Sequence, residues 1–102
     1  MYIYNVTVNI EAAAHNAWLE WMQTEHIPAM LATGKFNKAL MARVQVEEET
    51  GGTTYSVQYT APNRETLQKY YKENAETLHA QGNPFEGKFV AFRTELQVIS
   101  EH

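Results

Sequence analysis

The segment from Trp18 to Phe36 holds the residues best suited to chemistry in this chain of 102 residues. It contains both tryptophans, the adjacent Glu25 and His26, and Pro28 two residues later. An imidazole titrates near neutral pH, so a histidine in a pocket can take or give a proton. Pro28 disturbs the helical hydrogen bonds before it and places His26 near a helix end, where free carbonyls favour imidazolium. His26 is therefore the candidate catalytic acid/base, and its alternative role is to cap those carbonyls.

Glu25 is a secondary candidate. Adjacent residues of a helix do not face one another, so Glu25 and His26 are not expected to form a catalytic dyad. Glu25 falls instead on the apolar helical stripe of Trp18, Trp21 and Met22, where a carboxylate would be paired or have a raised pKa. We favour a salt bridge at the edge of a helix–sheet interface over a role at a ligand.

Aromatic residues gather near this segment in the expected fold. Tyr4, Tyr55, Tyr59 and Phe92 are predicted on the helix-facing side of the sheet, opposite Trp18 and Trp21 and opposite Tyr70 or Tyr71. They form either a solid, tyrosine-rich core or the wall of an apolar pocket with His26 and phenol hydroxyls as its polar groups. Such a pocket suits a small aromatic or carbonyl compound. The predicted ligand-binding residues are Trp18, Trp21, Met22, Glu25, Tyr55 and Tyr59.

Several other kinds of chemistry are disfavoured by the composition. The chain has no cysteine, and its four histidines show no HxH, HxxxH or HExxH spacing, so neither a metal nor a cofactor is expected. The GxSxG, GxGxxG and GxxxxGK[ST] motifs do not occur.

The net charge of −4, with scattered Lys and Arg, argues against nucleic acid and against a membrane surface as partners. The N-terminal sequence does not resemble a signal peptide and no apolar run is long enough to span a bilayer, so we expect a cytoplasmic protein.

Hydrophobic periodicity predicts six elements in the order β-α-β-β-α-β. The predicted strands cover residues 2–10, 35–47, 53–61 and 89–99, and the two strands in the middle are joined by a turn at residues 48–52. The first helix runs from about residue 11 to 32, with a kink or break at residues 25–28 that moves Ile27 away from helical angles and with Gly34 as C-cap. The second begins after its N-cap Asn63 and stops at Gly82. This order predicts a single α+β domain over residues 1–102: a ferredoxin-like sandwich with a four-stranded antiparallel sheet in the order 4-1-3-2 and both helices on one face.

The alternation within each strand predicts which side chains meet the helices. In the second and last strands we expect the apolar residues to do so, namely Phe36, Leu40, Ala42, Val44, Val46, Val90, Phe92, Leu96 and Val98. The opposite face then carries mostly polar residues: Asn5, Thr7, Asn9, Met41, Arg43, Ser56, Gln58, Arg93, Glu95 and Gln97, with Ile3, Ala39 and Ala91 among them. Such a face either lies in solvent or joins two copies sheet to sheet, and composition does not choose between these alternatives.

The run from Trp21 to Pro28, continued by Gly34 and Phe36, resembles the W-x-x-x-[ED]-H-x-P…G-F signature of EthD-like proteins in the dimeric α/β-barrel superfamily. With YSVQYTA from Tyr55 and KFVAFRTEL from Lys88, the whole chain resembles more closely an uncharacterised bacterial family described only as a domain of unknown function. This resemblance implies a protomer that forms a homodimer through its sheet face. Among functional residues it carries over only His26, with Trp21 and Pro28 beside it, and it matches no axial haem histidine.

Two functions follow as hypotheses. The first is a homodimer with one small-molecule pocket per subunit, in which His26 transfers a proton on an aromatic or carbonyl compound. The alternative is a non-enzymatic ligand-binding or assembly module, in which His26 caps a helix and the tyrosines fill the core. Haem binding is a third possibility within the superfamily.

Overall fold

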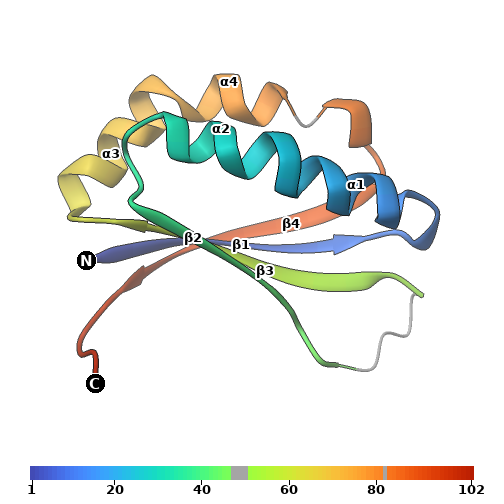
Figure 1. Cartoon of the computed structure of the whole chain (residues 1–102), viewed down its shortest axis with the longest axis horizontal. Coiled ribbons are helices and arrows are strands. Elements are labelled where there is room, and N and C mark those ends of the chain that lie inside the picture. Colours follow the sequence, from blue (N-terminus) through green and yellow to red (C-terminus); the bar gives the residue numbers. More distant parts are fainter. Residues whose placement is uncertain (47–50, 82) are drawn as a thin grey trace.

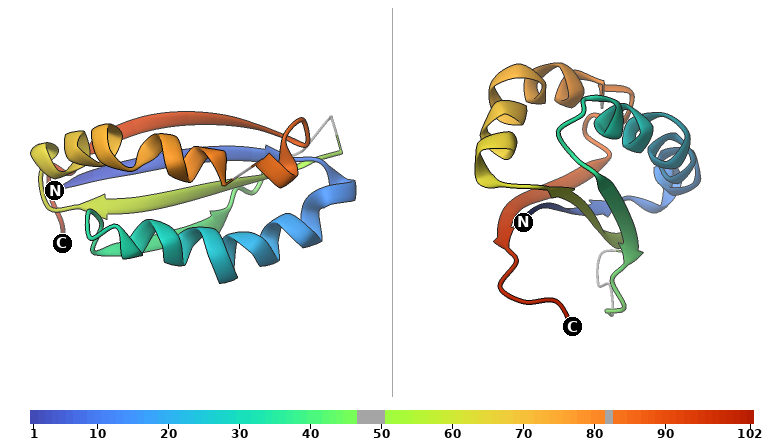
Figure 2. Two further views of the ribbon diagram at one scale, coloured as in Figure 1. Left: turned by 90° about the horizontal axis from the view of Figure 1, so that it is seen from above. Right: turned by 60° about the vertical axis from the view of Figure 1, so that its left-hand side comes forward.

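Four antiparallel strands form one sheet in the computed structural model, and the helices lie on one face of it (Figures 1 and 2). The structure describes residues 1–46, 51–81 and 83–102. The strands are β1 (Tyr2–Ile10), β2 (Lys38–Arg43), β3 (Thr53–Ala61) and β4 (Phe89–Gln97), in the spatial order β2-β3-β1-β4. This order is the predicted 4-1-3-2 order read from the other edge, so the ferredoxin-like topology is confirmed.

The strand β1 is the centre of the sheet. It pairs with β3 and β4 along all nine of its residues, with Tyr2 opposite Ala61 on one side and opposite Gln97 on the other. Its alternation of apolar and polar residues sends Val8 and Ile10 into the core beneath the helices. Residues directly opposite each other in antiparallel strands share a face of the sheet. The pairing with β1 therefore determines which side chains of β3 and β4 face the helices.

The first helical segment is continuous but changes its winding. A 3-10 turn (Ala12–Ala14) leads into α1 (His15–Trp21), then a π-helical turn (Met22–His26), and then α2 (Ile27–Ala32). Ile27 keeps helical angles (φ −61°, ψ −45°), so the prediction that Pro28 moves Ile27 out of the helix is wrong. The Ile27 N–H bonds to the Met22 carbonyl five residues earlier, and this wider turn accommodates the proline ring within the helix. Gly34, at φ +76°, follows the end of α2, as predicted for its C-cap.

The second helical segment is divided where one helix is predicted. It consists of α3 (Arg64–Glu73) and α4 (Ala75–Ala80), with Asn74 between them at φ −128° and ψ −31°. The Asn74 side chain accepts a hydrogen bond from Lys35 Nζ at 3.2 Å, a contact outside its own helix. A 3-10 turn (Asn83–Phe85) follows. The predicted stop at Gly82, and most of the turn predicted at residues 48–52, lie outside the described residues.

The side chains of β2 lie on the opposite faces of the sheet from those predicted. Leu40 is 62% exposed, whereas its neighbours Ala39 and Met41 pack against the core from the helix-facing side. The prediction assumed that the alternation begun at the buried Phe36 continues into the strand. The chain bends at Asn37 instead, and this bend shifts the alternation by one residue.

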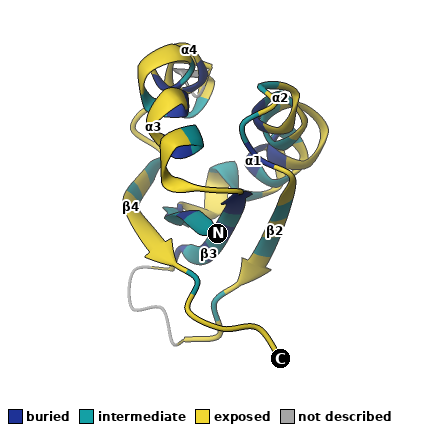
Figure 3. Ribbon diagram, turned by 90° about the vertical axis from the view of Figure 1, so that its left-hand side faces the viewer, coloured by how far each residue is buried: buried dark blue, intermediate teal, exposed yellow. Residues whose placement is uncertain are grey.

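The side chains of β4 also lie on the opposite faces of the sheet from those predicted. Arg93 lies opposite Val6 of β1 and so points to the helices, while Phe92 lies opposite Thr7 on the outer face and is 70% exposed. Both β2 and β4 are edge strands of the sheet. Both edge strands consist of exposed and intermediate residues (Figure 3), so an edge tolerates a charged side chain on the helix side.

The core lies between the central strands and the helices, where the buried side chains are concentrated (Figure 3). Its largest fully buried side chains are Tyr59, Tyr70, Ile10, Met30, Leu67 and Val57. Within the described residues, no helix is long and apolar enough to cross a membrane.

The N-cap of α3 offers a test of how the second helical segment is held. The Asn63 side chain accepts hydrogen bonds from the Thr66 backbone N–H at 2.8 Å and from the Thr66 hydroxyl at 2.9 Å. We expect Asn63→Ala to lower the free energy of unfolding by about 1 kcal/mol, which corresponds to a fall in Tm of roughly 4–8 °C for a chain of this size. Asn63→Asp keeps an acceptor at the helix N-terminus and should unfold close to the wild-type temperature. Thermal unfolding followed by circular dichroism measures both, and equal losses in the two variants would contradict the capping role.

Candidate functional site

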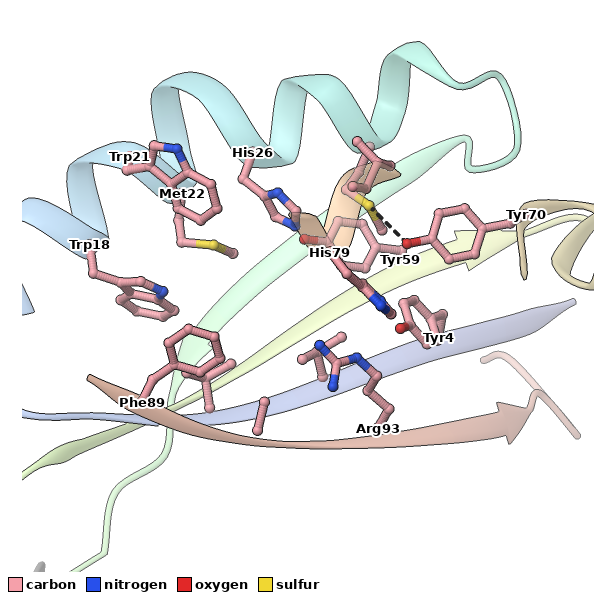
Figure 4. A pocket seen from close by; sticks show the side chains of 15 residues that line it. Tyr4, Trp18, Trp21, Met22, His26, Tyr59, Tyr70, His79, Phe89 and Arg93 are labelled. Carbon is pink, nitrogen blue, oxygen red and sulfur yellow. Dashed lines mark hydrogen bonds between the residues drawn. The ribbon is translucent and has the colours of Figure 1, made fainter. Parts of the chain in front are cut away.

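A cavity of about 70 Å³ lies between the sheet and the helices (Figure 4). A single ordered water needs roughly 10–15 Å³ of such space, so the cavity holds several waters or part of a small molecule. Every strand of the sheet except β2 contributes to it, as do the first and second helical segments. It is lined by Tyr4, Val6, Val8, Trp18, Trp21, Met22, His26, Met30, Tyr59, Tyr70, Leu78, His79, Phe89, Ala91 and Arg93.

The π-helical turn brings His26 and Trp21 together. Residues five apart in an α-helix are separated by about 140° around its axis. The π turn, whose hydrogen bonds span five residues, instead places them nearly one above the other. The two rings stack with their centroids 4.8 Å apart and their planes 21° apart. Trp21 in turn contacts Phe85, at 5.3 Å between ring centroids. This stack fixes the His26 ring at the cavity, where Figure 4 shows it pointing down from the helix.

The His26 imidazole is held in its neutral form. Its pKa falls from 6.5 to about 4, chiefly through burial, and the nearby His79 and Arg93 contribute because they disfavour a further positive charge. The expectation that helix carbonyls favour imidazolium is therefore wrong, since the helix continues past His26 without a free end. Among the described residues, His26 Nδ1 has no hydrogen-bond partner although it is buried. A buried nitrogen without a partner is costly unless a bound group satisfies it.

The polar end of the cavity is formed by Arg93 of β4, His79 of α4 and Tyr4 of β1. Burial raises the pKa of the Tyr4 phenol, and a hydrogen bond with the positively charged Arg93 partly offsets this rise. The Tyr70 hydroxyl donates a hydrogen bond to Met30 Sδ at 3.4 Å. Burial lowers the pKa of His79, as it does that of His26, and the positive charge of Arg93 is a second cause. Arg93 and His79 are both exposed, so they mark the end of the cavity that opens to solvent.

Over residues 1–99 the chain matches the family described as Domain of unknown function (DUF4286). The chain belongs to this family. A family with a domain of unknown function was the prediction from the sequence, and it is confirmed. Comparison with curated proteins yields no match.

Several solved structures share the fold of this DUF4286 protein. A dimeric ferredoxin-like protein from an uncultured marine organism is 9% identical, covering 99% of this chain and 97% of that one, with a TM-score of 0.76. A second dimeric ferredoxin-like protein from an uncultured marine organism is 16% identical over 100% and 98% of the two chains, with a TM-score of 0.71. An ethyl tert-butyl ether d (EthD) family protein from Bacillus halodurans is 14% identical over 97% and 100%, with a TM-score of 0.70. At these identities the likeness shows a shared fold.

The structure of this DUF4286 protein brings most of the predicted site residues together. Trp18, Trp21, Met22, His26 and Tyr59 all line the cavity. Tyr55 and Glu25 do not. Tyr55 contacts His15 instead, with 2.6 Å between the hydroxyl and Nε2, and their rings stack at 5.7 Å. The Glu25 side chain is exposed on the helix, away from the stripe on which it was predicted.

Sequence analysis missed Arg93, His79 and Phe89 as lining residues. Arg93 and Phe89 were missed because the β4 alternation was assigned to the wrong faces. The sequence does carry the relevant signal: residues 89–97 alternate between two sets, and the set with Phe89, Ala91 and Arg93 also contains apolar side chains. His79 has no comparable signal, since its approach to the cavity depends on how α4 continues after Asn74. The described residues contain no group of three His, Cys, Asp or Glu side chains that could hold a metal ion.

The state of His26 can be measured by titration. We expect its NMR resonances to titrate with a pKa of about 4 in the folded protein. Because the ordinary value is 6.5, the unfolded chain binds more protons between these two values. The contribution of His26 to stability is therefore present in full above pH 6.5 and is lost as the pH falls toward 4. The whole change is on the order of 3 kcal/mol.

The matched control for this titration is His26→Gln, which removes the titrating group. The difference in free energy of unfolding between the wild type and this variant should change across the same pH range. Urea denaturation at several pH values measures it, and the carboxylates common to both proteins cancel. A His26 pKa near 6.5 in the folded protein would show that its ring is not buried as described.

Proposed function

We propose that this protein is a homodimer that binds a small aromatic or carbonyl compound in one pocket per subunit and transfers a proton on it, with His26 as the acid/base. One observation carries the proposal: a neutral histidine with a buried, unpartnered nitrogen is held at a cavity with aromatic walls. A neutral imidazole is the form that can accept a proton at physiological pH.

The proton transfer requires only groups that the chain supplies. With a ketone as substrate, neutral His26 removes a proton from the carbon next to the carbonyl, which leaves an enolate and an imidazolium. The imidazolium then returns a proton to that carbon or to the enolate oxygen, so that the imidazole is neutral again.

The apolar walls favour a flat ligand. Trp18, Met22 and Phe89 lie together at one end of the cavity, and the Trp21 ring is fixed beside His26 by their stack (Figure 4). Aromatic rings bury a large apolar area and prefer stacked or edge-to-face contacts with other rings. An aryl group is therefore the best complement to this end.

The outer face of the sheet supports the homodimer. Large apolar side chains are exposed along its two edge strands: Leu40 at 62%, Val90 at 59%, Phe92 at 70% and Leu96 at 41%. Soluble monomers seldom expose apolar residues in such a group. Two of the fold neighbours are described as dimeric ferredoxin-like proteins, which favours a second copy of this chain as the partner.

The polar centre of this outer face is compatible with burial. Ser56 Oγ donates to Asn5 Oδ1 at 2.7 Å, and Asn5 Nδ2 donates to Thr94 Oγ1 and to Thr7 Oγ1, each at 3.2 Å. Covering polar groups is costly mainly when they lose hydrogen bonds to water without replacement. Because these groups are already paired within one protomer, a second sheet can cover them at lower cost.

Hydrogen–deuterium exchange tests the proton transfer. We expect the wild-type protein in D₂O to accelerate exchange at the carbon next to the carbonyl of phenylpyruvate, of phenylacetone, or of both, as followed by ¹H NMR. His26→Gln should lower that rate by roughly 10²–10⁴-fold, the usual contribution of a general acid or base.

The control for this experiment is His15→Gln, which alters a histidine that does not line the cavity. Its exchange rate should equal that of the wild type. Binding of either ketone with no acceleration of exchange would favour the non-enzymatic binding module. Equal rates for His26→Gln and the wild type would exclude His26 as the acid/base.

The dimer is tested at Phe92, the most exposed apolar residue of the outer face. We expect the wild-type protein to sediment as a dimer and Phe92→Glu to sediment as a folded monomer, because a carboxylate buried without a partner opposes association. Leu31→Glu is the matched control, since it introduces the same charge at an exposed position on α2. A wild-type monomer at micromolar concentration would contradict the homodimer.

A further inference from the structure

We infer that the pocket selects an organic anion, an aryl compound whose carboxylate is bound by Arg93 while its ring lies among Trp18, Met22 and Phe89. This inference names the class of ligand for the proposed function and rests on it. It concerns which compounds the pocket retains, and not whether His26 moves a proton.

The charge of Arg93 is not balanced within the described part of the chain. No ion pair joins its guanidinium to a described carboxylate; the two ion pairs found there are Lys35–Glu73 and Lys88–Glu11. Its hydrogen-bond partner is the neutral Tyr4 phenol. A guanidinium offers five donors in a planar fork that matches a carboxylate, and one phenol oxygen satisfies few of them.

The nearest acid on the same strand is engaged elsewhere. Glu95 lies two residues from Arg93 on the helix-facing side, opposite Tyr4 of β1. Its carboxylate accepts a hydrogen bond from the Tyr71 hydroxyl, and this neighbouring negative charge helps raise the pKa of that phenol. Glu95 is exposed and already has Tyr71 as a partner, and Arg93 keeps donors for another acceptor.

Arg93 brings a positive charge to the cavity lining although the chain as a whole is acidic. None of the described residues that line the cavity is Asp or Glu, and the lining groups that can carry positive charge are His26, His79 and Arg93. Burial chiefly lowers the pKa of both histidines, and the positive charge of Arg93 contributes to this lowering. The net charge of the whole chain is −4, so this local charge does not reflect composition. An anion entering the cavity would supply the missing counter-charge.

The two ends of the cavity have different chemistry, and they fix the order of groups in the ligand. Figure 4 shows Trp18, Met22 and Phe89 at one end and Tyr4, His79 and Arg93 at the other, with His26 between them. An aryl group at the first end and a carboxylate at the second would place the linking carbons beside His26. These carbons are where a carbonyl would activate a C–H bond for proton transfer. Aryl-substituted short-chain carboxylates, including the 2-oxo acids, have this arrangement.

The test compares phenylacetate with phenylacetamide, which has the same shape and no charge. Isothermal titration calorimetry of the full chain gives the Kd of each probe. We expect phenylacetate to bind at least tenfold more tightly than phenylacetamide, as charge-assisted hydrogen bonds are stronger than neutral ones. Arg93→Gln should remove this preference, and Arg93→Lys should restore part of it, because it keeps the charge and loses the planar fork.

Two controls keep the outcome interpretable. Arg64→Gln removes the same charge at the exposed beginning of α3, outside the cavity, and should leave both Kd values unchanged. Thermal unfolding of the Arg93 variants confirms that they fold, and Arg93→Lys serves if the glutamine variant does not.

The inference is overturned if the two probes bind equally, if neither binds, or if Arg93→Gln weakens both to the same extent. Each of these results can be distinguished from a failure of the proposed proton transfer by His26. Phenylacetone is neutral, so its exchange at a His26-dependent rate would uphold proton transfer even where anion selection fails. Anion selection without any exchange would uphold the pocket and exclude the acid/base role.

Discussion

The π-helical turn at Met22–His26 is the constraint on which the candidate site depends. An unbroken α-helix would point Trp21 and His26 in directions about 140° apart, so only one of them could face the sheet. The wider turn lets both side chains reach the cavity, and their rings stack at 4.8 Å. It also accommodates Pro28 without ending the helix, so that Met30 of α2 still reaches the core and accepts the Tyr70 hydrogen bond. Turns of this kind are frequent at functional sites because they reorient a single side chain.

The stack determines the chemistry of His26 as well as its position. A histidine that capped a free helix end would be solvated and would gain from a positive charge. Burial against Trp21, with Arg93 nearby, has the opposite effect and keeps the imidazole neutral. The neutral ring is a base and a hydrogen-bond partner, which is the form that a ligand in an apolar cavity can use. The same groups that hold His26 in place therefore also set its protonation state.

The sequence is sufficient to predict the topology, because β1 and β3 alternate cleanly and Asn63 and Gly34 mark helix ends by local chemistry. The same local chemistry does not predict the π turn, since Pro28 is compatible with a kink, a break or a bulge. The facing of β2 and β4 depends on the bend at Asn37 and on pairing with β1. These are tertiary effects that a strand's own alternation does not contain. Most of the aromatic wall was therefore predictable, whereas Arg93 and His79 were not.

The reversed facing of β4 links the two surfaces of the sheet. Phe92 and Arg93 are adjacent, so alternation sends one of them outward and the other to the helices. The predicted facing would bury Phe92 under the helices and place Arg93 on the outer face among mostly polar residues. The observed facing leaves apolar side chains of β4 on the outer face, where a second sheet is proposed to pack, and places a cation at the cavity. The pairing of β4 with β1 thus determines both the outward position of Phe92 and the helix-facing position of Arg93. The surface proposed for the dimer and the charge proposed for ligand selection are consequences of this one pairing.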